Sequence, residues 1–412
     1  MNDDTEVSAE DQAIGERVRH VRRRRGKSLE TVAGLAGIHH SFLSRLERGE
    51  RAFTRRGLLE NLAAVLSCSV ADLTGQPYLA PDPETAAATA AIPQLNLAFY
   101  DTGLDDTPDV PARPLPTLVA AAHAANVHAD NVQYELAGRN LGQIITELQV
   151  IANTRNGDDR RRALAGLAEA SEVAYSLART TGHFELAVAA ARRGFDAAER
   201  AERLDLMGLL AMSRSIALMR LGARRAAANV TRETLAAFTD APSPRGDDTE
   251  IGEAHGMLHL TGALIAARDE DTTASDTHLE EARSLARHTG ERNHLHFHFG
   301  PANVAAWELS LHVESGRGVE AAERFEASCV DVSMFGSRER ESSIHFDLAR
   351  GWAQAEGARD DRVIRALDTA DRLAPVRVRN DALARDIVMD VDRRSKRRVW
   401  ELDSLKNRLG VA

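Results

Sequence analysis

Three histidines separated by single apolar residues form the group in this chain that is most suited to metal chemistry. His294 and His298 would share one face of a helix, four positions apart, which is a spacing used by paired metal-binding imidazoles. No cysteine, aspartate or glutamate nearby in the sequence completes an obvious ligand set. We therefore expect histidines that pack or line a groove, with no metal ion and no other cofactor.

A second polar group follows this strip, inside alanine-rich sequence. Asn303 is polar at a position where packing alone would accept an apolar residue, and arginines and aromatic rings lie further along the chain. Hydrogen-bond donors beside aromatic rings suit a small amphiphile or a short peptide that carries an acidic group. A hydrogen bond between helices explains Asn303 equally well. The candidate effector-binding residues are Phe299, Asn303, Trp307, Arg338, Arg340 and His345.

Catalytic signatures are missing from the sequence. It has no paired catalytic carboxylates, no nucleophile elbow, no phosphate-binding glycine loop and no zinc-protease spacing. We therefore expect that the protein is not an enzyme.

Positive charge gathers near the start of the chain. Residues 10–75 carry twelve Lys and Arg against eight Asp and Glu, whereas residues 76–412 have a net charge of −11. The run Arg22-Arg23-Arg24-Arg25 adds to this basic segment. A small basic segment on a large acidic body predicts a polyanionic partner at one end only.

The basic segment reads as five short helices. Ile14, Val18 and Val21 recur at helical spacing, and Ser28 is placed to cap a second helix. Gly37 provides the residue with positive φ that a sharp turn between two crossing helices requires. Apolar residues at helical spacing continue to Leu73.

These features fall in register with a known motif. The stretches SLETVAGLAGIHHSFLSRLERGER and LLENLAAVLSCSVADL make residues ~12–75 resemble the helix-turn-helix domain of the phage-repressor-like (XRE) family of transcription regulators. The sequence departs from the commoner pattern at Phe53, where many relatives have proline, and at Gly57.

The resemblance implies roles for individual residues. In this family the second helix of the motif enters the major groove of double-stranded DNA, and residues near its N-terminus contact base edges. The expected readers are His39, His40, Ser41, Ser44 and Arg45, with Arg45 best suited to guanine. Arg51, Arg55 and Arg56 are expected to contact phosphates, and Arg22 and Glu47 to form an internal salt bridge.

Residues 76–117 separate this domain from the rest of the chain. Eight of the twelve prolines lie here, which predicts a loosely structured linker with a short helix around residues 85–91. The apolar strip 95–100 is expected to dock onto the body.

Residues 118–412 show helical periodicity almost throughout. Gly182, Gly222, Asp269, Gly316 and Gly357 each lie between two Ala- and Leu-rich helical segments, at intervals of about 40 to 47 residues. This pattern resembles tetratricopeptide repeats, and stretches such as Phe299-Gly-Pro-Ala-Asn-Val304 resemble actinobacterial regulators with the same two-part layout. Stacked helix pairs of this kind form an α-solenoid with a concave groove.

The expected fold is therefore all-α: a five-helix helix-turn-helix domain at 10–75, a Pro-rich linker at 76–117 and a tetratricopeptide-like sensing and dimerisation domain at 118–412. No apolar run is long enough to span a membrane, and a cytoplasmic location is expected.

Together these features predict a sequence-specific transcription regulator. A homodimer would bind a palindromic operator, and the body would bind a small-molecule or peptide effector. The alternative is a protein-interaction scaffold whose repeat groove binds a partner polypeptide. A change of DNA affinity caused by a small ligand or a peptide would separate the two.

Overall fold

The computed structural model describes residues 13–78, 82–240, 249–397 and 399–411. Within these ranges the regular elements are all helices, so the predicted all-α class is confirmed. None of the described helices combines the length and the apolarity that crossing a bilayer requires.

Five helices form the N-terminal head, as predicted for residues 10–75, of which 10–12 lie outside the described ranges. They are α1 (Ile14–Arg24), α2 (Leu29–Leu35), α3 (His40–Glu47), α4 (Arg56–Leu66) and α5 (Val70–Thr74).

Local interactions set where the head helices begin and how closely they pack. The Ser28 side chain accepts a hydrogen bond from the Thr31 backbone N–H, which caps α2. Gly37 adopts a φ of +71° in the turn between α2 and α3. Gly15 lies so close to α3 that a Cβ atom there would be 2.0 Å from the Leu46 carbonyl oxygen. Glycine at position 15 therefore allows α1 to pack against α3.

The segment expected to be a loosely structured linker contains two helices, α6 (Pro83–Thr89) and α7 (Ile92–Tyr100), and α7 is the helix that the prediction missed. The short helix expected at 85–91 corresponds to α6. Leu95 is fully buried, because α7 packs against the body. Pro83 and Pro93 lie in the first turns of these helices, where proline is tolerated because no N–H partner is lost.

The body contains the remaining helices. They are α8 (Leu115–Asp130), α9 (Tyr134–Gly138), α10 (Leu141–Thr154), α11 (Gly157–Thr180), α12 (Phe184–Arg200), α13 (Leu204–Arg220), α14 (Arg224–Asp240), α15 (Thr249–Arg268), α16 (Thr272–Thr289), the 3-10 turn η1 (His294–His296), α17 (Pro301–Glu314), α18 (Gly318–Ala327), the 3-10 turn η2 (Val332–Phe335), α19 (Arg338–Ala353), α20 (Asp360–Leu373), α21 (Pro375–Arg379), α22 (Ala382–Arg394) and α23 (Trp400–Leu409).

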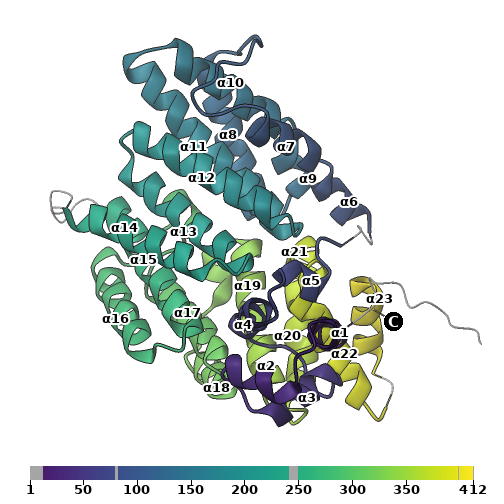
Figure 1. The fold of residues 1–412 in the computed structure, drawn as a ribbon. Coiled ribbons are helices and arrows are strands. Elements are labelled where there is room, and N and C mark those ends of the chain that lie inside the picture. The colour runs from purple at the N-terminus through teal and green to yellow at the C-terminus, as the bar shows by residue number, and fades with distance from the viewer. Residues whose placement is uncertain (1–12, 79–81, 241–248, 398, 412) are drawn as a thin grey trace, which may run out of the picture.

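The predicted breakers fall inside helix pairs. Gly182, Gly222, Asp269, Gly316 and Gly357 follow α11, α13, α15, α17 and α19, and each lies before the partner helix of its pair. The members of each pair pack against each other, and successive pairs form a curved array (Figure 1). Helix pairs with tight turns are thus observed, while their tetratricopeptide subtype stays a prediction.

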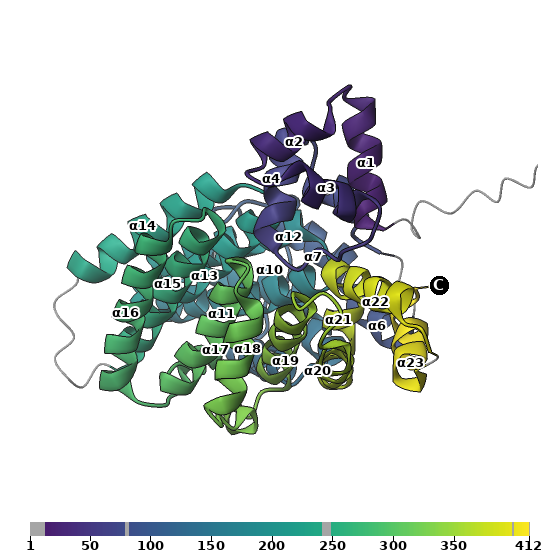
Figure 2. The same cartoon turned by 90° about the horizontal axis from the view of Figure 1, so that it is seen from below.

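The head is packed onto the body. One hydrophobic cluster combines head residues such as Leu43 and Leu62 with residues of α17 to α23, such as Trp352 and Leu383. A second cluster covers α6 to α17. Figure 2 shows the head on one side of the curved body, with α3 above α22. Head and C-terminal helices therefore share a core.

Three histidines form a chain between α15 and α16. His259 Nδ1 lies 3.0 Å from His278 Nδ1, and His259 Nε2 lies 3.2 Å from His255 Nε2. Burial, together with the two neighbouring imidazoles, lowers the pKa of His259 from 6.5 to about 3. The neutral form of this side chain is therefore favoured in the folded protein.

This depressed pKa predicts a loss of stability in acid. The unfolded chain binds a proton at His259 near pH 6.5, whereas the folded protein does so near pH 3. The stability that the neutral His259 side chain contributes is therefore fully present above pH 6.5 and is lost as the pH falls towards 3. We expect His259→Gln to flatten the slope of unfolding free energy against pH in this window. Urea unfolding at several pH values measures the slope.

His288→Gln, which changes an exposed histidine on α16, is the matched control. Equal slopes for His259→Gln and the parent protein would contradict the assignment.

Candidate DNA-binding head and effector cavity

The N-terminal part of α3 is the exposed part of the predicted recognition helix. His39, His40 and Ser41 are all exposed. His39 Nδ1 lies 2.7 Å from Ser41 Oγ and accepts the Ser41 backbone N–H, so His39 caps α3. Ser44 Oγ accepts a hydrogen bond from Arg48. These side chains lie where the resemblance places base-reading groups.

Arg45 and Arg51 face the body. Arg45 Nη2 is 3.0 Å from one Glu356 carboxylate oxygen, and Arg51 Nη2 is 2.6 Å from the other. The side chains of Arg45 and Glu356 are 41% and 45% exposed, so water screens this pair and competes with it. Arg45 must exchange Glu356 for a base to read DNA.

Removing Glu356 is therefore expected to strengthen DNA binding. Exposed ion pairs contribute about 0.2–1 kcal/mol, so losing the pair with Arg45 in Glu356→Gln should raise DNA affinity about 1.4- to 5-fold, less at high salt. Fluorescence anisotropy with a labelled operator measures the change.

Glu323→Gln removes the same charge elsewhere on the body, where Glu323 pairs with Arg359. If both variants raise affinity equally, net charge and not the contact with Arg45 is responsible.

The other two predicted phosphate contacts bind partners in the body, and for Arg56 this corrects the sequence-based assignment. Arg56 is only 8% exposed and its Nη2 lies 2.5 Å from Asp381 Oδ2. Arg55 donates through Nε to the Glu314 carbonyl oxygen at 2.5 Å and pairs with Glu270 at 3.2 Å. A buried guanidinium needs a carboxylate partner nearby, so Arg56 does not face solvent as a phosphate contact must. The Arg55 side chain is 24% exposed, and its guanidinium is held by these partners in the body.

A buried charge network joins the head to the body. Glu60 of α4 accepts a hydrogen bond from Arg268 Nη1 at 2.7 Å, and Arg268 Nη2 lies 3.6 Å from Glu314. Glu314 also accepts from Arg350 Nη2 at 2.6 Å and from the Gly57 backbone N–H at 3.2 Å. Burial alone would raise the pKa of Glu314, but the surrounding arginines outweigh it and hold the pKa at about 2. Glu314 is therefore ionised and central to the contact.

The internal salt bridge predicted for the head is present. Arg22 donates through Nε and Nη2 to the two Glu47 oxygens at 2.6 and 2.7 Å. Such a bidentate pair fixes α1 against α3 and supports the structural role that the resemblance implied.

A cavity of about 280 Å³ lies on the inner face of the body and reaches α4 of the head. Its walls come from α8, α11, α13, α15, η1, α17, α19 and α21. The apolar lining includes Tyr175, Leu209, Met212, Ile216, Met257, Leu264, Leu295, Phe297, Trp307 and Phe346.

Half of the predicted effector-binding residues line this cavity, namely Asn303, Trp307 and Arg340. Phe299 is fully buried and packs against Gly256, outside the lining. Arg338 is exposed and donates to the Arg372 carbonyl oxygen. His345 is also outside the lining, and burial lowers its pKa. These last three positions are therefore not part of the cavity wall.

Arg340 is a half-buried cation with an unused hydrogen-bond donor. Its Nε donates to Asn303 Oδ1 at 2.8 Å, and Asn303 Nδ2 donates to the Phe297 carbonyl oxygen at 3.1 Å. Its Nη2 is buried and has no hydrogen-bond partner among the described residues. Burial lowers the pKa of Arg340 to about 10, still above neutral pH. The Asn303–Arg340 pair thus holds a charged donor at the cavity wall.

Positive charge exceeds negative charge around the cavity. Glu172 has its pKa raised to about 7 by burial, and Ser213 donates to it at 2.9 Å. Glu339 has a pKa of about 2, because Arg377 and Arg179 together outweigh its burial. The described charged lining comprises Arg56, Arg179, Arg220, Arg268, Arg340, Arg350 and Arg377 with Asp130, Glu172, Glu314, Glu339 and Asp347.

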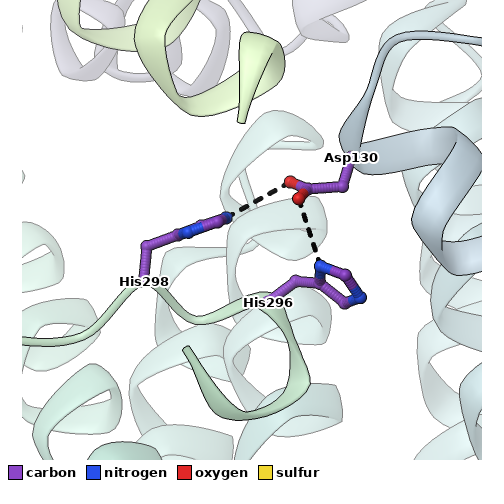
Figure 3. Close-up of side chains that lie close together, drawn as sticks. All are labelled: Asp130, His296 and His298. Carbon is purple, nitrogen blue, oxygen red and sulfur yellow. Dashed lines mark hydrogen bonds and ion pairs between the residues drawn. The ribbon is translucent and has the colours of Figure 1, made fainter. Parts of the chain in front are cut away.

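One cluster in the cavity wall was not predicted from the sequence. Asp130, at the end of α8, lies between His296 and His298 (Figure 3). His296 Nδ1 is 3.1 Å from one carboxylate oxygen and His298 Nε2 is 3.2 Å from the other. The acid that the histidine strip lacked is thus supplied from 166 residues away, a distance at which no local pattern could reveal it.

The comparisons with known proteins identify the head. Residues 13–74 match the family model of a helix-turn-helix domain. No curated protein and no solved structure matched the chain. The N-terminal region of this chain is therefore a helix-turn-helix DNA-binding module, joined to a long helical body.

Proposed function

We propose that the protein is a sequence-specific transcription regulator of the phage-repressor-like type, in which the helical body senses an effector. The helix-turn-helix match carries the DNA-binding part, and the exposed N-terminal part of α3 supports it. Double-stranded DNA would be read in the major groove by His39, His40, Ser41, Ser44 and Arg45.

The cavity supports a small acidic effector. The buried Nη2 group of Arg340, which has no partner among the described residues, suits a carboxylate, and the apolar walls suit a hydrocarbon or aromatic body. A cavity of about 280 Å³ is close to the lower end of the size range of small-molecule sites, about 300–1,000 Å³. This volume favours effector binding over a scaffold role.

Residues that line the cavity and also contact the head would couple effector binding to DNA binding. Arg56, Arg268, Glu314 and Arg350 line the cavity and also bind the head or its neighbours. A ligand alters DNA binding only if its affinity differs between two arrangements of the protein. Movement of these charges on ligand binding would change how firmly the head is docked.

Dimerisation completes the proposal. A single head contacts one half-site, and a palindromic operator requires two heads about 34 Å apart. Sedimentation of the full chain at micromolar concentration is expected to show a dimer, and a monomer would contradict this element of the proposal.

The effector site is tested with the full chain and a panel of medium-chain and aryl carboxylates. At least one is expected to raise the melting temperature of the parent and to change its affinity for an operator selected from genomic fragments. Arg340→Met should abolish both effects, because the charged donor is lost. Arg338→Ala is the matched control, since Arg338 lies outside the cavity.

The outcomes separate the two functions. If no carboxylate acts on the parent, or if Arg340→Met responds like the parent, the acidic-effector proposal is wrong. If the parent selects no DNA sequence, the regulator proposal is wrong.

A further inference from the structure

We propose that Asp130, His296 and His298 bind a divalent transition-metal ion, such as Zn²⁺, in the wall of the cavity. The proposal concerns residues that the DNA-binding function does not use. It departs from the expectation drawn from the sequence, which found no acidic residue to join the histidines.

The geometry of the three side chains carries the inference. One ligand atom from each lies within 4.8 Å of the other two. Figure 3 shows the two imidazoles approaching Asp130 from the same loop, one ring at each carboxylate oxygen. An ion between these groups would replace two hydrogen bonds with coordinate bonds and would require only small movements. Two imidazole nitrogens and a carboxylate form a donor set that suits zinc and related ions.

The backbone holds the histidines in an unusual conformation. Leu295, His296 and His298 have φ values of +51°, +59° and +49°, in the left-handed region that non-glycine residues rarely adopt. The loop is tied by a hydrogen bond from the His298 backbone N–H to Asn293 Oδ1 at 3.0 Å. Strain of this kind persists where the surroundings fix it, and it is concentrated at functional sites.

The carboxylate is oriented by a neighbour that is not itself a ligand. Ser337 Oγ donates to Asp130 Oδ1 at 2.5 Å. Ser337 Oγ also accepts a hydrogen bond from the Arg340 backbone N–H and so caps α19. Such outer hydrogen bonds orient ligands and tune metal affinity. The proposed site would therefore connect α8, the 294–298 loop and α19.

A second cluster of side chains is also a candidate metal site. Asp205, Glu250 and His294 also lie within 4.8 Å of one another. There, however, Arg203 donates to both oxygens of Asp205, at 2.9 and 2.5 Å. The guanidinium already neutralises this carboxylate and repels a dication, so the Asp130 cluster is the favoured site.

Three protein ligands leave at least one coordination position for an outside group. Asp130, His296 and His298 all line the cavity, so that position would be reached from its interior. Water would fill it, or an anionic ligand bound in the cavity.

Metal binding by the full chain tests the proposal directly. Protein without a polyhistidine tag is stripped with EDTA, dialysed, and titrated with Zn²⁺ by calorimetry and with Co²⁺ by visible absorption. We expect one equivalent per chain and a Co²⁺ spectrum typical of nitrogen and oxygen ligands. His298→Ala and Asp130→Asn should weaken binding about 100-fold or more, and Ser337→Ala about 10- to 100-fold.

His294→Ala is the matched control, because it removes a histidine from the same strip but belongs to the Asp205 cluster. This variant should bind Zn²⁺ like the parent. Circular dichroism establishes that each variant is folded. The proposal is overturned if the parent binds no stoichiometric Zn²⁺ or Co²⁺, or if His294→Ala loses binding while folded His298→Ala retains it.

Discussion

Glu314→Gln is expected to lower the free energy of unfolding by about 3–5 kcal/mol, the cost of breaking a buried ion pair by removing one partner. Glu314 is 2% exposed, accepts hydrogen bonds from Arg350 and the Gly57 backbone N–H, and forms an ion pair with Arg268. Glutamine keeps the shape but leaves two buried guanidinium groups without their shared charge. Urea unfolding followed by circular dichroism measures the loss.

Glu320→Gln is the control, because Glu320 is exposed on the neighbouring helix α18. It should change stability by no more than about 0.5 kcal/mol. A loss for Glu314→Gln as small as that of the control would show that the network does not hold the head.

Arg45→Ala is expected to weaken binding to the specific operator by about 1–3 kcal/mol, which is roughly 5- to 150-fold, and to relax the preference at one base position. The Arg45 guanidinium can donate two hydrogen bonds to guanine, and its exposed pair with Glu356 is too weak to prevent this exchange. Anisotropy titrations with the operator and single-base variants measure both effects.

Arg45→Lys separates charge from geometry, because lysine keeps the positive charge without the planar fork. It should retain the salt dependence and lose base discrimination. Equal weakening of all sequences by Arg45→Ala would assign this residue to phosphate contact, and unchanged affinity would show that the predicted groove register is wrong.

The helices of the head could be predicted because their signals are local. Ser28 caps α2, Gly37 provides the turn, and the apolar stripes have helical spacing, so each feature is visible within a few residues. The helix pairs of the body followed in the same way from breakers such as Gly182. Helix α7 was missed because Pro93 lies in its first turn, where a proline begins a helix as readily as it interrupts one.

The contacts between distant segments could not be predicted. Arg56 looks like a phosphate contact until Asp381 is placed beside it, and no local pattern shows that pairing. The cavity was predicted in part, since Asn303 stood out as a polar residue in alanine-rich sequence and Arg340 was a candidate for the same groove. Asp130 did not stand out, because an aspartate at the end of a helix is ordinary until the fold brings His296 and His298 to it.

The shared core of the head and the last helices has a consequence for synthesis on the ribosome. Domains emerge and fold from the N-terminus, so the head is complete long before α22 is translated. Until then Phe53, whose backbone N–H donates to Asp386 Oδ2 at 2.6 Å, and the buried Arg56 lack their C-terminal partners. A nascent or truncated chain would thus present a folded head with an apolar, charged face uncovered, a ready target for chaperones and proteases. In the complete protein this face of the head is covered by the C-terminal helices.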